Sequence, residues 1–318
     1  MPDRPQLSVI VPLYNEEESI GHLHEAISTE VSRLGVSYEL VFVNDGSRDR
    51  TLELATELAR KDSRLRVVNF RRNYGQTPAM AAGIEKASGE ILVTMDGDLQ
   101  NDPADIGNFL AKIREGYDIV VGWRHDRQDK LVSRKIPSMI ANRLIGRVTG
   151  VPIKDNGCSL KAFRGELIKQ IPLYSEMHRF IPAMASIAGP RIAEIKVRHH
   201  ARQFGQSKYG LSRIYKVLLD LMVIKTITTF VSKPLLWFTL LSLPLMLLGL
   251  GTLGYSLLAL LDGTRPFPLP IAGTGIIFLS ASFMMFLSGA MGELIFKLGD
   301  LQQHRFPQLT ATVRRGPQ

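Results

Sequence analysis

Two aspartates separated by one glycine form the most informative pattern in this chain. Asp96, Gly97 and Asp98 follow residues 91–95, an apolar run typical of a short buried strand. Glycine lets the backbone turn sharply here, and carboxylates at the carboxyl end of a strand lie where open α/β sheets bind ligands. Hard divalent cations bind carboxylate oxygens together with substrate phosphates. The pattern therefore predicts that Asp98 binds a cation and, through it, a diphosphate, although a solvated Asp-Gly-Asp turn would show the same residues.

Two further polar turns follow predicted strands near the start of the chain. The apolar run 7–13 precedes Tyr14 and Glu16, and the run 38–43 leads through Asn44 to Asp45. Because the carboxyl ends of parallel strands meet at one edge of a sheet, the three turns can converge on one ligand. The first strand is not followed by a glycine-rich phosphate loop, which argues against a dinucleotide site or a P-loop.

Strand and helix patterns alternate through the first 125 residues. Near-continuous runs of valine, isoleucine and leucine indicate strands buried on both faces, so we expect an α/β fold with a mostly parallel sheet. Asn15 is a predicted N-cap, with three glutamates in the first turn of the helix that follows. Residues 124–210 are less regular. The remaining predicted elements are strands at 65–70, 90–95 and 116–121 and helices at 51–61 and 77–87.

The composition changes sharply along the 318-residue chain, which is 45% hydrophobic and carries a net charge of +9. After Lys233 ionisable side chains almost vanish. Tyr255 is the single ionisable residue in 235–261, and residues 266–292 have no ionisable side chain. Each stretch exceeds the roughly 20 apolar residues that cross a bilayer. Their length and their lack of a polar face argue against two buried helices of a soluble protein. We therefore expect two transmembrane helices joined by a short loop.

Basic residues gather beside these apolar stretches. Nucleic acid binding would also explain a positive chain, but this clustering favours a lipid bilayer as the partner and no nucleic acid. Juxtamembrane lysines and arginines mark the cytoplasmic side and attract anionic lipid. Residues 211–233 suit an amphipathic helix in the headgroup layer, or a helix packed under the soluble domain. The cations that precede the apolar stretches in the sequence are Arg198, Arg202, Lys208, Arg213, Lys216, Lys225 and Lys233. Those that follow them are Lys297, Arg305, Arg314 and Arg315.

With cations at both ends of the hairpin, both termini and the soluble domain are expected in the cytoplasm. The first residues lack the apolar core of a signal peptide, and Cys158 is the single cysteine, which fits a reducing compartment. Ser288 and Gly292 form a small-xxx-small pair that could join copies into a homo-oligomer. The expected order is a soluble domain at 1–210, a juxtamembrane helix at 211–233, two transmembrane helices within 234–292 and a cytoplasmic tail at 293–318.

Taken together, the motifs resemble those of family 2 glycosyltransferases of the GT-A type. The likeness covers essentially the whole chain and is strongest to dolichol-phosphate mannose synthases and bacterial polyisoprenyl-phosphate glucosyltransferases. It implies a bacterial inner-membrane enzyme with a GT-A domain. By this resemblance, Asp98 and Gln100 would bind Mg²⁺ or Mn²⁺ on the donor diphosphate. The nucleotide-sugar donor would be held by Pro12, Tyr14, Glu16, Asp45, Asp96 and Gly97.

The resemblance also implies an acceptor side. Residues 154–164 resemble the family's acceptor-side acidic segment, with Asp155 as its functional carboxylate, and residues 202–210 resemble a loop that closes over both phosphates. Residues 177–180 stand where processive synthases carry Q-x-x-R-W, and that pattern is absent here. The acceptor phosphate would be bound by the cations Arg124, Arg127, Arg134, Arg202 and Lys208 and by the hydroxyl of Ser207.

The chemistry follows from the expected acceptor, a polyprenyl phosphate. A phosphate monoester is mostly dianionic at pH 7 and has little need of a base to become a nucleophile. Its negative charge repels the donor diphosphate, and arginines are well suited to reduce that repulsion. In-line displacement would invert the anomeric centre. Asp155 would then position a substrate, stabilise oxocarbenium-like charge or act as a base. We expect UDP-glucose as donor; a processive synthase, a transferase acting on diacylglycerol or protein, and a non-catalytic nucleotide-binding scaffold remain alternatives.

Overall fold

The computed structural model describes two compact units, each taken by itself. Described in the first unit are residues 4–125, 146, 150–171, 173, 177–185 and 189–201, and in the second residues 233–263 and 268–302, with side chains to Ile295. Several predictions lie outside these residues. They concern Arg127, Arg134, Arg202, Ser207, Lys208, the helix at 211–233 and the tail beyond 302.

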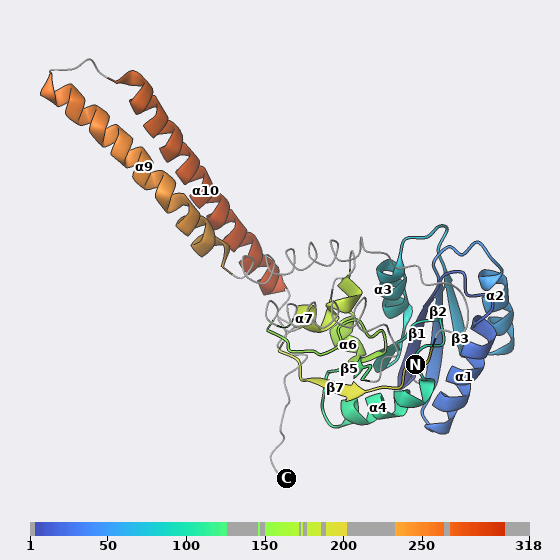
Figure 1. The fold of residues 1–318 in the computed structure, drawn as a ribbon. Helices are drawn as coiled ribbons and strands as arrows, with labels where there is room; N and C mark the ends of the chain where they lie inside the picture. Colours follow the sequence, from blue (N-terminus) through green and yellow to red (C-terminus); the bar gives the residue numbers. More distant parts are fainter. Residues whose placement is uncertain are drawn as a thin grey trace, which may run out of the picture. The chain divides into compact units, whose positions relative to one another are not determined.

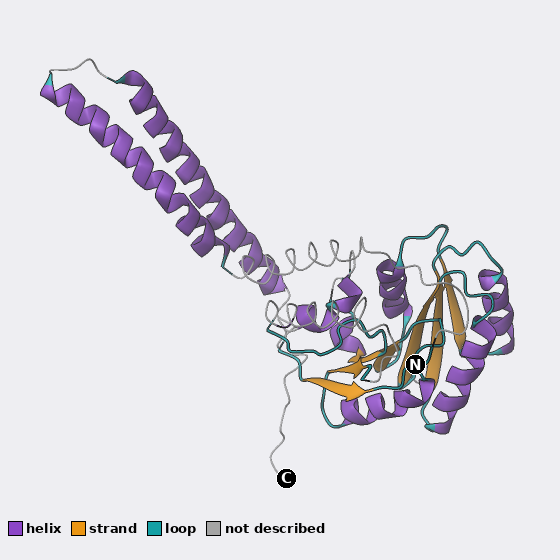
Figure 2. Cartoon of the chain, in the orientation of Figure 1, coloured by secondary structure: helices purple, strands orange, loops and turns teal. Residues whose placement is uncertain are grey.

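A seven-stranded sheet forms the centre of the first unit, in the order β3-β2-β1-β4-β6-β5-β7 (Figure 2). Within the described sheet β6 is antiparallel to both of its neighbours, and the other pairs are parallel. The predicted α/β fold with a mostly parallel sheet is therefore confirmed. The strands are β1 (Leu7–Leu13), β2 (Tyr38–Asn44), β3 (Leu65–Asn69), β4 (Ile91–Thr94), β5 (Ile119–Trp123), β6 (Lys161–Arg164) and β7 (Ile192–Lys196).

Helices cover both faces of this sheet, which explains why its central strands are apolar throughout (Figure 1). Alternate residues of β1 point to opposite faces, so Val9 packs with α1, α2 and α4, whereas Ile10 packs with α3, α6 and α7. The helices are α1 (Ile20–Arg33), α2 (Thr51–Lys61), α3 (Gln76–Lys86), α4 (Ile106–Arg114), α6 (Gly165–Ile168) and α7 (Ile181–Ala185), with short 3₁₀ turns η1 (Pro103–Asp105) and η3 (Met177–Arg179).

The predicted N-cap at Asn15 is wrong. Helix α1 begins at Ile20, and Asn15 has a left-handed φ of 54°. The reason is a contact with a distant loop, because the Asn15 side chain accepts a hydrogen bond from the backbone N of Arg48 at 2.9 Å. Ser19 instead precedes the helix, and its hydroxyl donates to the Glu16 carboxylate at 2.7 Å.

The second unit is a hairpin of two long apolar helices, α9 (Pro234–Asp262) and α10 (Leu269–Gln302). Both are long and apolar enough to cross a membrane. Small residues let the helices approach, since a Cβ on Gly249 would lie 2.7 Å from Leu279. Gly292 of the proposed oligomer motif lies against Pro234 of the same chain, where an added Cβ would come within 3.1 Å. Helix α10 begins three residues later than the predicted position 266.

Candidate active site

The carboxyl ends of β1, β2 and β4 bring the three polar turns to one edge of the sheet. Leu13 pairs with Asn44, and Ile10 pairs with Thr94. Beyond the strands, the backbone N of Asp45 donates to the carbonyl of Leu13 at 2.8 Å and that of Met95 donates to Ile10 at 3.1 Å. Pro12 at the end of β1, with Tyr14 and Glu16 after it, therefore lies beside Asp45 and the turn Asp96-Gly97-Asp98.

Asp45 holds a neighbouring loop in place. Its carboxylate is 3% exposed and accepts hydrogen bonds from the backbone N of Tyr74 at 2.7 Å and of Gly75 at 2.9 Å. Burial raises the pKa of Asp45, and these two hydrogen bonds oppose that rise only in part. A carboxylate has about four lone-pair sites, so a bond to the nucleoside remains open to it. That predicted contact stays a prediction.

Gly46, next to Asp45, has φ +63°, and a Cβ there would lie 2.2 Å from the carbonyl carbon of Arg72. We expect Gly46→Ala to destabilise the fold by about 2–4 kcal/mol, combining left-handed strain with overpacking. Gly35→Ala is the matched control, because Gly35 has φ +64° but nothing within 4 Å. Urea denaturation of both variants measures the difference. Equal losses would show that the close approach of the two loops has no energetic weight.

The predicted metal ligands lie on a tight turn. Asp98 is 7% exposed, and its Oδ1 accepts a hydrogen bond from the backbone N of Gln100 at 3.1 Å. Gly97 is needed for this turn to approach β1, since an added Cβ would lie 2.6 Å from Leu13 Cδ2. Among the described residues there is no cluster of three His, Cys, Asp or Glu side chains that could hold a metal alone. Two oxygen ligands fit an ion that is shared with substrate phosphates, as Mg²⁺ commonly is.

Asp96 is held by a residue that the sequence analysis missed. Gln76, the first residue of α3, donates from Nε2 to Asp96 Oδ1 at 2.6 Å. Asp96 is half-buried and lies close enough to Arg124 to raise the pKa of that guanidinium. Asp96 therefore lies between Gln76 and Arg124.

Arg124 and Asp155 form a buried, bidentate ion pair. Arg124 Nε donates to Asp155 Oδ2 at 2.7 Å and Nη2 donates to Oδ1 at 2.9 Å, and the Asp155 residue is 3% exposed. Burial works against the charge of Arg124, but the hydrogen bond and charge of Asp155 raise its pKa above the ordinary value. Both carboxylate oxygens are engaged, so Asp155 is arranged to hold Arg124 rather than to take a proton. Arg124 in turn contacts Asp155 before any phosphate arrives.

Beneath this pair lies a second missed residue, Lys161. It is buried at the start of β6, and its ammonium donates to the backbone carbonyls of Cys158 and, at 3.3 Å, of Asn156. Burial lowers the pKa of Lys161 to about 8. Its hydrogen bonds fix the turn that follows Asp155, so Lys161 supports the backbone beside this carboxylate.

His178 contacts helix α3 at Thr77, the residue after Gln76. It is 5% exposed, and its Nδ1 lies 2.7 Å from the hydroxyl of Thr77 in α3. Burial lowers the pKa of His178 well below its ordinary value, with Arg179 and Lys161 adding to the effect. His178 is therefore neutral near pH 7. The segment that stands in place of Q-x-x-R-W thus packs against the helix that carries Gln76.

Three carboxylates at one sheet edge form a candidate site for a metal shared with an anionic ligand, and known proteins resemble this chain in sequence and in fold. Residues 8–172 match the family described as "Glycosyl transferase family 2". A dodecaprenyl-phosphate galacturonate synthase of Rhizobium johnstonii is 43% identical, over 91% of this chain and 87% of its own length. An undecaprenyl-phosphate 4-deoxy-4-formamido-L-arabinose transferase of Salmonella typhimurium is 37% identical, over 92% and 89%.

Solved structures agree on the fold. A glucosyl-3-phosphoglycerate synthase of Mycobacterium tuberculosis, in complex with Mn²⁺, UDP and glucosyl-3-phosphoglycerate, superposes with a TM-score of 0.53 at 18% identity, covering 70% of this chain and 79% of the other. The same enzyme with Mn²⁺ and UDP-glucose gives a TM-score of 0.54 over the same shares. These neighbours confirm the predicted GT-A fold. The chain therefore belongs to glycosyl transferase family 2.

Proposed function

We propose that this chain transfers one sugar from a nucleotide sugar to a polyprenyl phosphate at a membrane surface. The convergence of Asp45, Asp96 and Asp98 at one sheet edge is the observation that carries the proposal. Two further facts support it. Both relatives act on a polyprenyl phosphate, as their names state, and their matches extend over nine-tenths of this chain. This chain has two helices long and apolar enough to cross a membrane.

In this proposal the donor binds at the carboxylates on the turns that follow β1, β2 and β4. Asp98 and Gln100 would hold Mg²⁺ or Mn²⁺, which when bound offsets the negative charge of the nucleoside diphosphate as it leaves. Asp96, which accepts a hydrogen bond from Gln76, would lie beside the sugar, between donor and acceptor. Tyr14 and Asp45, which follow β1 and β2, would contact the nucleoside.

On the acceptor side a phosphate oxygen attacks the anomeric carbon while the bond from that carbon to the diphosphate breaks. The nucleoside diphosphate carries away the electron pair, and in-line attack inverts the anomeric centre. The acceptor dianion needs no base, which agrees with an Asp155 carboxylate that is already engaged by Arg124. We propose that Arg124 keeps its remaining N–H groups for the phosphate. Arg127, Arg134, Arg202, Ser207 and Lys208 stay candidates for the same task.

The sugar is the finer question. The resemblance of the motifs pointed to glucose from UDP-glucose, whereas the relatives act with galacturonate and with 4-deoxy-4-formamido-L-arabinose, according to their names. Identity of 43% over 91% of the chain supports galacturonate more strongly than the motifs support glucose. We therefore propose a UDP-hexuronate donor, with UDP-glucose as the competing candidate.

Mass spectrometry of the lipid product tests both levels of this proposal. The purified full chain in vesicles with undecaprenyl phosphate and Mn²⁺ is given UDP-galacturonate, UDP-glucose or UDP-4-deoxy-4-formamido-L-arabinose in separate reactions. We expect one sugar per lipid phosphate, formed at least about tenfold faster from UDP-galacturonate, which corresponds to 1.4 kcal/mol. The Asp98→Ala chain is the blank.

Each other outcome contradicts a stated part of the proposal. Faster transfer from UDP-glucose restores glucose as the sugar. Chains of several sugars identify a processive enzyme. Product on diacylglycerol rather than on the lipid phosphate rejects the acceptor, and the absence of product with every donor leaves a nucleotide-binding scaffold.

We further propose that the catalytic unit and both termini face the cytoplasm, because lysines and arginines flank both apolar helices.

A further inference from the structure

The segment that leaves β7 is paired with the turn that carries the candidate metal ligands. Asn101 and His199 form an antiparallel bridge. The carbonyl of Gln100 accepts a hydrogen bond from the backbone N of His200 at 2.9 Å and lies 3.1 Å from His199 Nδ1. A residue that fixes positions 198–200 would therefore also fix the backbone of Gln100, two residues beyond Asp98.

Arg198 is such a residue. Its backbone N donates to Asp105 Oδ2 at 2.8 Å, and its Nε and Nη2 donate to Asp105 Oδ1 at 3.2 and 3.1 Å. Its Nη1 lies 3.1 Å from Asp102 Oδ2, an oxygen that His200 Nε2 also approaches at 3.3 Å. Asp105 is 4% exposed, so removal of Arg198 would leave its carboxylate buried without this partner. We call these four residues, Arg198, Asp102, Asp105 and His200, the clamp.

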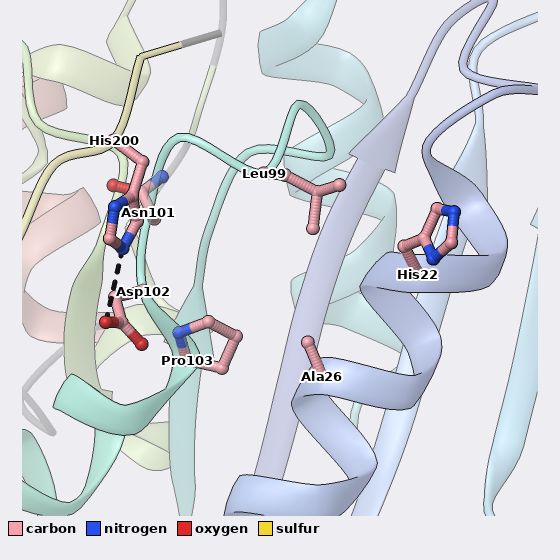
Figure 3. A pocket seen from close by; sticks show the side chains of 7 residues that line it. All are labelled: His22, Ala26, Leu99, Asn101, Asp102, Pro103 and His200. Carbon is pink, nitrogen blue, oxygen red and sulfur yellow. Dashed lines mark hydrogen bonds and ion pairs between the residues drawn. The ribbon is translucent and has the colours of Figure 1, made fainter. Parts of the chain in front are cut away.

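The turn is held only in part from the side of α1, where the Ser19 hydroxyl donates to the carbonyl of Gly97 at 3.1 Å and Leu99 packs against the core. A cavity of about 310 Å³ lies between residues 99–103 and α1. Figure 3 shows Leu99 above this hollow, with His22 and Ala26 on α1 facing Asp102 and Pro103 across it. Leu99 also has a left-handed φ of 59°, which a leucine rarely adopts. A strained turn beside a cavity depends on the contacts that surround it, and the clamp supplies several of them.

We propose that Arg198 is a positioning residue for divalent metal binding: through Asp102 and Asp105 it holds the turn 98–101 in the shape in which Asp98 and Gln100 can share one cation. The inference rests on the proposed metal-dependent transfer and deepens it. Residues that orient metal ligands without touching the metal change metal affinity by about 10- to 100-fold when they are replaced. Arg198 has that place here.

Direct Mn²⁺ binding to the full chain tests the proposal without relying on turnover. Electron paramagnetic resonance measures Mn²⁺ bound to the purified protein in the presence of UDP, for wild type, Arg198→Ala, Arg198→Lys and Asp102→Asn. We expect the dissociation constant for Mn²⁺ to be about 10- to 100-fold larger in Arg198→Ala than in wild type. Arg198→Lys should recover part of the loss. Asp102→Asn, which keeps the Asp105 contact, should weaken binding only a fewfold.

Arg164 provides a matched control at the opposite edge of the same sheet. It pairs with the buried Asp118 at 3.1 Å, and Asp118 also accepts a backbone hydrogen bond, from Arg191 at 2.8 Å. Arg164 lies opposite Ile91, at the start of β4, far from the turn. Arg164→Ala should therefore lower the unfolding temperature about as much as Arg198→Ala while Mn²⁺ binding stays at the wild-type level.

The outcomes separate this inference from the proposed function. Wild-type Mn²⁺ affinity in Arg198→Ala, or an equal loss of affinity in Arg164→Ala, would overturn the positioning role and leave the transfer reaction intact. A wild-type chain that binds no Mn²⁺ with UDP would instead contradict the metal-dependent function itself. Should Arg198→Ala fail to fold, Asp102→Asn and Arg198→Lys still decide the matter, because both keep Asp105 paired.

Discussion

Replacing Asp98 with alanine is expected to lower sugar transfer by about a thousandfold or more. A bound cation supplies several kcal/mol of charge stabilisation to a departing diphosphate, and each 1.36 kcal/mol is a factor of ten in rate. Asp98 is the one carboxylate of the turn that is both buried and engaged by the backbone of Gln100, so the side chain is already oriented. Initial rates measured over a Mn²⁺ titration give the effect on kcat and on the metal requirement.

Two controls make this result specific. Asp98→Asn keeps the shape and the hydrogen bond from Gln100 but removes the charge, so it should remain nearly as inactive. Asp62→Ala removes another carboxylate, which pairs with Arg64 before β3 and lies away from the site edge, and it should keep wild-type metal dependence. Full activity in Asp98→Ala, or activity that is indifferent to chelation of divalent cations, would contradict the metal assignment.

The second large effect is expected at the Arg124–Asp155 pair. Arg124→Ala leaves a carboxylate that is 3% exposed without its guanidinium, and removing one partner of a buried ion pair costs about 3–5 kcal/mol. We expect a corresponding fall in the free energy of unfolding of the catalytic unit, with transfer activity lost as well. Asp155→Ala should behave similarly, because it strands the buried Arg124 charge.

The double variant Arg124→Ala/Asp155→Ala distinguishes a paired structure from two independent contributions. Because it buries no unpaired charge, it should be less destabilised than the sum of the single variants, by at least about 1 kcal/mol. Additive losses would show that the two side chains do not act as a pair in solution. In kinetics, a severe loss in Arg202→Ala at wild-type stability supports electrostatic escort of the acceptor, whereas a loss in Asp155→Asn that exceeds the loss in Arg124→Ala supports a base.

The strands that lead to the three polar turns could be predicted from the sequence because they are buried on both faces. The apolar runs that became β1, β2 and β4 give an unbroken signal, and each ends in the polar turn that was singled out. The helix predicted at 51–61 coincides with α2. The start of α1 was placed wrongly because a side-chain contact between Asn15 and Arg48, far apart in sequence, decides it.

The later strands β6 and β7 gave a weaker signal in the sequence. Strand β6 is four residues long with a charge at each end, so no period of two is visible, and β7 has two charges in five residues. Arg124 and Asp155 were each selected as site residues, but no pattern indicates that positions 31 residues apart form one pair. The same holds for Arg198 and Asp105, which are separated by 93 residues. Lys161 was missed because its partners are backbone carbonyls.

The reversed direction of β6 has a consequence for how such an enzyme can change its substrates. Because β6 runs against β4, the chain reaches the site edge with Asp155 before it enters the sheet. The β4–β6 ladder divides the sheet into β3-β2-β1-β4 on one side and β6-β5-β7 on the other. Arg124 and Asp155 belong to the second group, because Arg124 follows β5 and Asp155 precedes β6. Substitutions in that group would alter the surroundings of this ion pair while leaving the three polar turns after β1, β2 and β4 in place.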